Sequence, residues 1–592
     1  MKRITKFLSI AVLTLSFSAC GQTIEQEIYP TSISISGPDI VEVNKDIQLN
    51  AIFEPENTNM KKISWAVNDT SIAAINNSGL LTGRGEGNVV VTATSRYIST
   101  VTTQYNVTVV KGVVPVSSIS LDLSSVKLTI GKSAQLNTTI SPSDATNQNV
   151  TWSSENNDIV SVTNDGVITA NQLGSTTVSV TTEDGGFSDS CTVNVVKEVN
   201  AKWTIMIYMC GSSLESGTDD NGKVPSASNA EGIATSDIEE IISVDGQPDD
   251  VNIIIETGGS NVWKANDKFH ISNHNLERWH ISDHQLIKDA SLAKANMGLE
   301  KTFESFLEWG LTEYPAEKTG VIMWNHGGAM RGVCYDETAN NDRLLNSEVN
   351  SAFSKAFLAT NRNEKLEFIG YDACMMQLQD VADVNSQYFN YMIASQEEEA
   401  GFGWDYDSWI DDIYSDKSTE TILTSIVDGF IADNGGTEVL MYQGEIADQT
   451  LSYLDLSKMG EYKDAWESLA GALSSKINSN NKRSFSNLVR SSKTFADDEE
   501  KSYLSYGTFD VKDFIIKLQD DETFKVDEEI ANAVLTAHNN LVKYYVSQQK
   551  ALDAHGLSMF WAISSNTKKG TYYNSNETSF TIWQRLNSEY GY

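Results

Sequence analysis

One sequence pattern occurs twice in the first third of the chain, and it constrains the fold there more than any other feature. The tripeptide Gln-Leu-Asn at 48–50 recurs at 135–137, and Trp65 recurs as Trp152, so the period is 87 residues. In both copies, short runs of Val, Ile, Thr and Ser alternate with turns rich in Gly, Asn and Asp. Two β-rich copies at this spacing predict two consecutive antiparallel β-sandwiches.

The repeated segments also share the patterns S/T-W and G-x-x-x-V-x-V-T. This layout resembles bacterial Ig-like domains of the type 2 family over residues 31–110 and 116–197. In that family such modules are spacers or adhesion units. The resemblance therefore implies two all-β Ig-like sandwiches, which we interpret as spacers.

The pattern changes at Ala201, where long apolar runs replace the short alternating ones. Runs such as KWTIMIYMC at 202–210 and VNIIIETGG at 251–259 alternate with stretches of helical periodicity, for example 347–359. Apolar strands that alternate with amphipathic helices predict a mostly parallel sheet with helices on both faces. We therefore expect a multidomain chain, in which an α/β domain over 201–592 follows the two sandwiches.

Two of the apolar runs end in residues that can do chemistry. The run TGVIMWNHGG carries His326 just after its apolar part, and LEFIGYDAC carries Cys374 at its end. Ligands of open α/β sheets bind beyond the carboxyl ends of the strands, and one crossover helix between these runs would make them neighbours. We expect His326 and Cys374 at the same edge of the sheet, where the imidazole can activate the thiol as a nucleophile.

Five ordered motifs, WTIMIYMCGSSLE, VIMWNHGG, FIGYDACMMQ, ASQEEEAGFGWDY and AHGLSMF, together resemble the clostripain family of cysteine peptidases, which has a caspase-like α/β fold. The resemblance covers residues 201–592. It implies an endopeptidase that cuts polypeptide substrates after Arg, less often Lys, with His326 and Cys374 as its catalytic dyad. The backbone N–H groups of Gly327 and Cys374 would stabilise the oxyanion.

The resemblance also suggests which residues bind the substrate's basic side chain. Asp372, two residues before the nucleophile, matches the Asp of the family motif, and its carboxylate would pair with a guanidinium. Asp405, in GFGWDY, is the second candidate. The run of glutamates at 397–399 is expected to lie in solvent.

Two further expectations follow from the family. Its members are often cut within a loop, and the polar, turn-like stretch NNDRLLNSE makes Arg343 the candidate for self-cleavage. Some members need calcium, which an acidic loop such as ESGTDDNG could bind, although the sequence requires no cofactor. His270, His274, His280 and His284 invite a metal interpretation, but they fit a surface hairpin, and we predict no metal site there.

The N-terminus predicts export. Residues 1–19 combine a basic start with an apolar run, as a signal peptide does, and Ser-Ala-Cys-Gly at 18–21 resembles a bacterial lipobox with Cys20 as the lipidated residue. Residues 20–30 would form a tether. We expect a membrane-anchored lipoprotein of the cell envelope. The net charge of −37 argues against nucleic acid as a partner.

Two alternatives remain open at this point. The chain could be a cell-surface binding or adhesion protein with an inactive peptidase-like domain, although both dyad residues are present. It could also be a caspase-fold peptidase that cuts after Asn or Asp.

Overall fold

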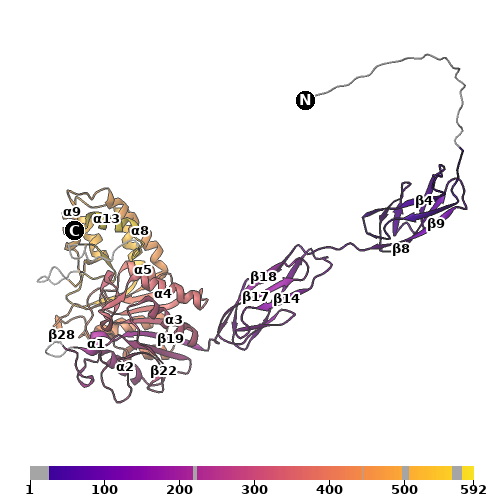
Figure 1. Ribbon diagram of the computed structural model, residues 1–592. Coiled ribbons are helices and arrows are strands. Elements are labelled where there is room, and N and C mark those ends of the chain that lie inside the picture. Colours follow the sequence, from indigo (N-terminus) through magenta and orange to yellow (C-terminus); the bar gives the residue numbers. More distant parts are fainter. Residues whose placement is uncertain (1–25, 218–222, 443–444, 497–505, 563–575, 592) are drawn as a thin grey trace, which may run out of the picture. The chain divides into compact units, whose positions relative to one another are not determined.

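The computed structural model describes residues 26–217, 223–442, 445–496, 506–562 and 576–591, with the side chains of 441–446 left out (Figure 1). The predicted signal peptide and Cys20 lie outside these residues. The chain divides into two compact units, and the larger one includes all of 191–592. No helix in the described ranges is both long and apolar enough to cross a membrane.

The two repeats fold into sandwiches of the same topology. In each, a four-stranded sheet faces a three-stranded sheet, with orders β2-β9-β8-β5 and β3-β7-β6 in the first and β11-β18-β17-β14 and β12-β16-β15 in the second. The first contains β1 (Ser32–Ser36), β2 (Ile40–Glu42), β3 (Asp46–Gln48), β4 (Asn50–Glu54), β5 (Ile63–Val67), β6 (Ala73–Ile75), β7 (Leu80–Gly83), β8 (Gly87–Ser95) and β9 (Thr102–Val110). The second contains β10 (Ser118–Leu121), β11 (Ser125–Thr129), β12 (Ser133–Gln135), β13 (Thr138–Ser141), β14 (Val150–Ser154), β15 (Val160–Val162), β16 (Val167–Ala170), β17 (Gly174–Thr182) and β18 (Ser188–Val196).

The described residues from Ala201 onward form the predicted α/β domain. Its main sheet has the order β22-β21-β20-β19-β23-β26-β27-β30-β32. The five central strands, β20 to β27 in that order, run parallel, and antiparallel strands extend both edges. The strands are β19 (Ala201–Cys210), β20 (Val251–Gly258), β21 (Asn275–Ser282), β22 (Gln285–Ala293), β23 (Ala316–Trp324), β26 (Leu366–Asp372), β27 (Phe389–Ala394), β30 (Thr450–Asp455) and β32 (Val542–Ser547).

Helices cover both faces of this sheet, as the sequence predicts. The central strands are buried on both sides, which explains their continuous apolar runs. One face packs against α3 and α4 and the C-terminal helices, and the other packs against α2, α6 and α7. The helices are α1 (Ser212–Ser216), α2 (Ile233–Ser243), α3 (Glu300–Glu313), α4 (Asn346–Ala359), α5 (Gln379–Asn385), α6 (Asp407–Tyr414), α7 (Thr419–Asp433), α8 (Met459–Ser474), α9 (Lys482–Ser491), α10 (Val511–Asp520), α11 (Glu528–Leu541) and α13 (Thr581–Tyr590).

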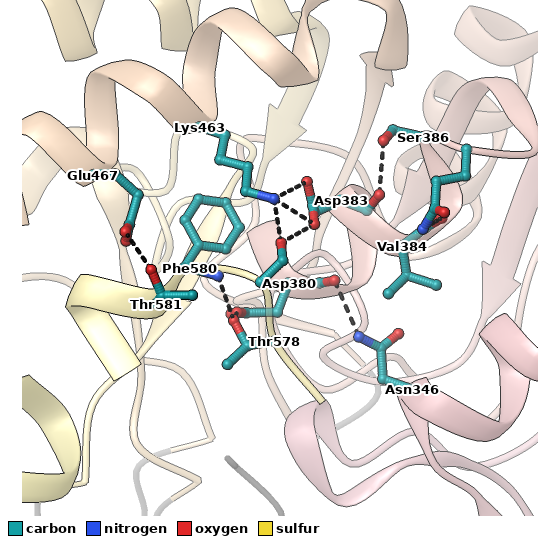
Figure 2. Close-up of polar contacts among 12 residues, drawn as sticks. Asn346, Asp380, Asp383, Val384, Ser386, Lys463, Glu467, Thr578, Phe580 and Thr581 are labelled. Carbon is teal, nitrogen blue, oxygen red and sulfur yellow. Dashed lines mark hydrogen bonds and ion pairs between the residues drawn. The ribbon is translucent and has the colours of Figure 1, made fainter. Parts of the chain in front are cut away.

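Polar contacts fix the C-terminal segment against α5, the helix that follows Cys374 (Figure 2). Lys463 on α8 pairs with Asp383 on α5 at 3.3 Å, and Thr578 donates a hydrogen bond to Asp380 on the same helix. Glu467 accepts a hydrogen bond from the backbone N–H of Ile582 at the start of α13. These contacts hold α5 in place, and α5 begins where the loop that carries Cys374 ends.

Candidate active site

The two predicted reactive residues leave neighbouring strands. β23 and β26 pair in parallel, with Trp324 opposite Asp372. The backbone N–H of Asn325 donates to the carbonyl of Asp372 at 3.2 Å, so the pairing continues past the ends of the strands. His326 directly follows Asn325, and Cys374 lies two residues after Asp372. Both residues are therefore at the carboxyl edge, where α/β sheets bind ligands.

Gly327 packs directly on the backbone of Cys374. A Cβ atom added to Gly327 would lie 2.0 Å from the Cys374 carbonyl oxygen and 2.9 Å from its nitrogen, which no side chain tolerates. The N–H of Gly327 also hydrogen-bonds the Cys374 thiol. A glycine is therefore needed for the His326 loop to approach the Cys374 loop this closely.

Cys374 is partly exposed and lies in a strained turn. Its sulfur accepts a hydrogen bond from the backbone N–H of Glu399 at 3.3 Å. Burial of the sulfur and the nearby Glu399 carboxylate raise the pKa of the thiol to about 12, so the resting group is neutral. Met375, the next residue, has φ 58°, a conformation that non-glycine residues adopt mainly where the surrounding structure enforces it.

His326 is held by a residue that the sequence did not single out. Its Nε2 atom shares a hydrogen bond with the Ser213 hydroxyl on α1 at 3.0 Å. Burial lowers the pKa of the imidazole below its usual value, because a charged ring would lose hydration. The ring is therefore neutral at pH 7 and can accept a proton.

A large acidic cavity lies beside these loops. It has a volume of about 780 Å³ and is formed by α2, the 264–268 segment and the 402–405 segment, but neither His326 nor Cys374 lines it. Seven carboxylates and two lysines line its wall: Glu231, Asp237, Glu239, Glu240, Asp267, Asp405, Asp433, Lys264 and Lys268. Burial and crowding of like charges raise the pKa of both Asp405 and Glu240 to about 7. This excess of acidic groups makes the cavity a suitable receptor for a cation.

Asp372 lies behind the cavity wall and does not line it. Its side chain is buried and accepts a hydrogen bond from the Tyr406 hydroxyl at 2.9 Å and a longer one from the Trp404 N–H. Burial raises its pKa to about 7. Gly403 has φ 70° and passes so close that an added Cβ would lie 3.0 Å from an Asp372 oxygen.

The comparisons with known proteins agree with this architecture. The model of the clostripain family matches residues 224–589, and the model of the bacterial Ig-like domain (group 2) matches 30–109 and 115–193. The first of these matches covers more than half of the chain.

The chain belongs to the clostripain family.

The individual relatives share 14 to 30% sequence identity with this chain. Clostripain from Hathewaya histolytica is 26% identical over 436 residues, which cover 64% of this chain and 78% of that protein. An uncharacterised protein of Clostridium acetobutylicum is 30% identical over 170 residues, which are 28% of this chain and only 17% of that relative. The structure of a secreted cysteine protease from Bacteroides thetaiotaomicron, bound to an irreversible peptide inhibitor, is 14% identical with a TM-score of 0.45 and covers 66% of this chain and 99% of that one.

The glutamate run of this clostripain-family domain does not lie in solvent as predicted. Glu398 is exposed, but Glu397 is buried, and the carboxylate oxygens of Glu399 are buried as well. Glu397 accepts hydrogen bonds from two backbone N–H groups and lies 3.7 Å from the Lys493 ammonium. The prediction holds for Glu398 but is wrong for Glu397 and for the Glu399 carboxylate, because the segment turns inward beside Cys374 after β27, and composition alone does not reveal that turn.

Arg343 is less exposed than the sequence suggests. It lies in β25 (Asp342–Leu344), which pairs with β24 (Val333–Asp336) as a short hairpin. Its side chain donates to the carbonyl of Arg331 at 2.8 Å, and Leu344 is fully buried. A peptidase needs an extended, accessible segment, so cutting here requires the hairpin to open first.

The histidine cluster forms a hairpin only in part. β21 and β22 pair around His284, and His280 pairs with Asp289, whereas His270 and His274 precede the hairpin. Within the described ranges no group of three or more His, Cys, Asp or Glu side chains is arranged to hold a metal. Residues 218–222 of the acidic loop, which the sequence offers for calcium, lie outside the described residues.

Proposed function

We propose that the chain is an exported cysteine endopeptidase that hydrolyses peptide bonds after Arg or Lys with a dyad of His326 and Cys374. The observation that carries the proposal is the position of Cys374, a partly exposed residue at the carboxyl edge of the sheet, with the His326–Gly327 turn packed on its backbone and an acidic cavity nearby. Membership of the clostripain family supports the reaction class.

The chemistry follows from these groups. The thiol proton of Cys374 passes to neutral His326, and the thiolate forms a bond to the scissile carbonyl carbon. The N–H groups of Gly327 and Cys374 stabilise the oxyanion, and the imidazolium then gives its proton to the leaving amine. Water then attacks the carbonyl carbon of the thioester while His326 takes the water's proton. The Cys374 thiolate leaves and regains that proton, which releases the acid product. No step requires a cofactor.

Substrate preference is the most direct test of the proposal. A set of fluorogenic peptides that differ only at the P1 residue is expected to be cut after Arg and Lys but not after Asn, Asp or Ala. No cleavage of any peptide would instead favour a binding protein with an inactive domain, and cleavage after Asn or Asp would refute the assignment of the acidic cavity.

Asp405 is the expected wall residue for the P1 side chain. Because the charged hydrogen bond would be lost, Asp405→Asn should lower kcat/KM for arginyl peptides about 10- to 100-fold. Asp372→Asn should weaken the Arg preference by changing the charge behind the wall. Asp411→Asn is the matched control, because Asp411 is exposed on α6 and does not line the cavity. Equal losses in the Asp411 and Asp405 variants would contradict the assignment.

We also propose a lipid anchor on Cys20. Wild-type protein is expected in the membrane fraction of the producing cell, and Cys20→Ser should release it in soluble form with unchanged peptidase activity. A wild-type protein that fractionates like the Cys20→Ser variant would refute the anchor.

A further inference from the structure

The residue that holds His326 follows the strand next to β23. β19 pairs in parallel with β23, with Met209 opposite Trp324, and β23 pairs in the same direction with β26. Ser213 follows the end of β19, just as His326 and Cys374 follow the ends of β23 and β26. Three adjacent parallel strands therefore deliver a hydroxyl, an imidazole and a thiol, in that order, to one edge of the sheet.

The short helix α1, which carries Ser213, is fixed by contacts that do not involve the histidine. The buried Glu215 carboxylate of α1 accepts hydrogen bonds from the backbone N–H of Thr235 at 3.0 Å and from the backbone N–H of Lys264 at 2.7 Å. These bonds hold α1 against α2 and against the 264–268 segment. The Ser213 hydroxyl is therefore already in place when it meets His326, as an orienting partner must be.

The hydrogen bond gives the two nitrogens of His326 different roles. Nε2 lies 3.0 Å from the Ser213 hydroxyl, whereas Nδ1 has no hydrogen-bond partner among the described residues and is not sealed from solvent. A neutral imidazole carries its proton on one nitrogen and a lone pair on the other. If the lone pair were on Nε2, the Ser213 hydroxyl would occupy it. With the proton on Nε2, the lone pair is on Nδ1 and can accept the thiol proton.

The nearby carboxylate does not take the place of the hydroxyl. Glu337, which follows β24, acts electrostatically on His326. Its Oε1 atom accepts a hydrogen bond from the backbone N–H of Asn261 at 2.7 Å, and within the described part of the chain it forms no hydrogen bond with the imidazole. The group that contacts the ring and orients it is therefore the neutral hydroxyl of Ser213.

We propose that Ser213 is a positioning residue of the peptidase reaction, which accepts a hydrogen bond from the Nε2–H of His326 and so directs Nδ1 to take the Cys374 proton. In that step the S–H bond breaks and an Nδ1–H bond forms. Nε2 keeps its proton, so the hydroxyl stabilises the imidazolium without exchanging a proton itself. The Nδ1 proton then passes to the leaving amine. This inference rests on the proposed function.

Variants at Ser213 test the proposal in the full-length protein, with kcat and KM for an arginyl peptide measured as a function of pH. Ser213→Ala should lower kcat about 10- to 100-fold and leave KM within about twofold, because a ring without its partner adopts the wrong tautomer and orientation more often. Ser213→Thr keeps the hydroxyl and should retain most of the rate. Ser213 is exposed, so melting curves of both variants should match the wild type.

Ser213→Asp separates a direct contact with the ring from a general disturbance of α1. A carboxylate against Nε2 favours the imidazolium and so raises the pKa of His326. The acid limb of kcat/KM, which reports loss of the neutral ring, should then move to higher pH by about one unit. Ser216→Ala is the matched control. It removes a hydroxyl from the same helix that donates to the carbonyl of Gly217, and it should leave kcat and the acid limb unchanged.

The inference is overturned if Ser213→Ala keeps the wild-type kcat, or if Ser213→Asp leaves the acid limb in place. Equal losses of kcat in Ser213→Ala and Ser216→Ala would overturn it as well, because they would reflect the packing of α1 alone. In each case cleavage after Arg by the wild type would still stand. Absence of that cleavage in the wild type would refute the proposed function separately.

Discussion

Replacing Cys374 with Ala is expected to lower the hydrolysis of arginyl peptides by at least about 10⁴-fold, to the background rate, because the proposed acyl intermediate forms on the Cys374 sulfur. Among the cysteines that the structure describes, Cys374 alone is partly exposed, whereas Cys191, Cys210 and Cys334 are buried. Loss of the side chain from a partly exposed position should leave the thermal unfolding midpoint nearly unchanged. The measurement is kcat/KM with a fluorogenic peptide, paired with a melting curve.

The matched control is Cys191→Ala. Cys191 is a buried thiol of the second sandwich and lies outside the peptidase domain, so its removal should leave hydrolysis unchanged. Residual activity above one per cent in Cys374→Ala, at unchanged protein purity, would mean that the reaction uses another nucleophile.

Replacing Gly327 with Ala should reduce kcat/KM by about 100-fold or more without unfolding the protein. The new methyl group would meet backbone atoms of Cys374 at 2.0 to 2.9 Å, and backbone cannot rotate aside as a flexible side chain does. The two loops must separate, and a displacement on the order of 1 Å at a reacting group costs about 100-fold in rate. The measurement is again kcat/KM, together with the rate of thiol alkylation.

A glycine in open space gives the control for this substitution. Gly471 lies in α8, and nothing lies within 4 Å of a Cβ added there, so Gly471→Ala should retain full activity and gain about 0.5 to 1 kcal/mol in unfolding free energy. Wild-type activity in Gly327→Ala would show that the close approach of the two loops is not needed for the reaction.

The placement of His326 and Cys374 could be predicted from sequence because it depends on strong local signals. Two continuous apolar runs, each followed by a polar residue and separated by one helical stretch, imply parallel neighbours, and the observed pairing of β23 with β26 matches that expectation. The sandwiches were predictable for the same reason, since a repeated alternation of polar and apolar residues indicates strands with one buried face.

The carboxylates behind the site could not be predicted in this way. Asp237 falls on a helix, where an acidic residue normally points to solvent, and Glu399 ends a run of three glutamates. Both are buried because the 395–406 segment and α2 enclose the end of β26, which is a tertiary arrangement. Ser213, the partner of His326, lies on α1, 113 residues earlier in the sequence, and no spacing rule connects the two.

The central claim is that Cys374 and His326 act together on a peptide bond after a basic residue. The most direct measurement is to treat the protein with an arginyl peptide chloromethyl ketone and to map the adduct by mass spectrometry. The account predicts one adduct per chain, on Cys374, formed far more slowly in His326→Ala. An adduct spread over several residues, or one on Cys374 that forms equally fast without His326, would contradict it.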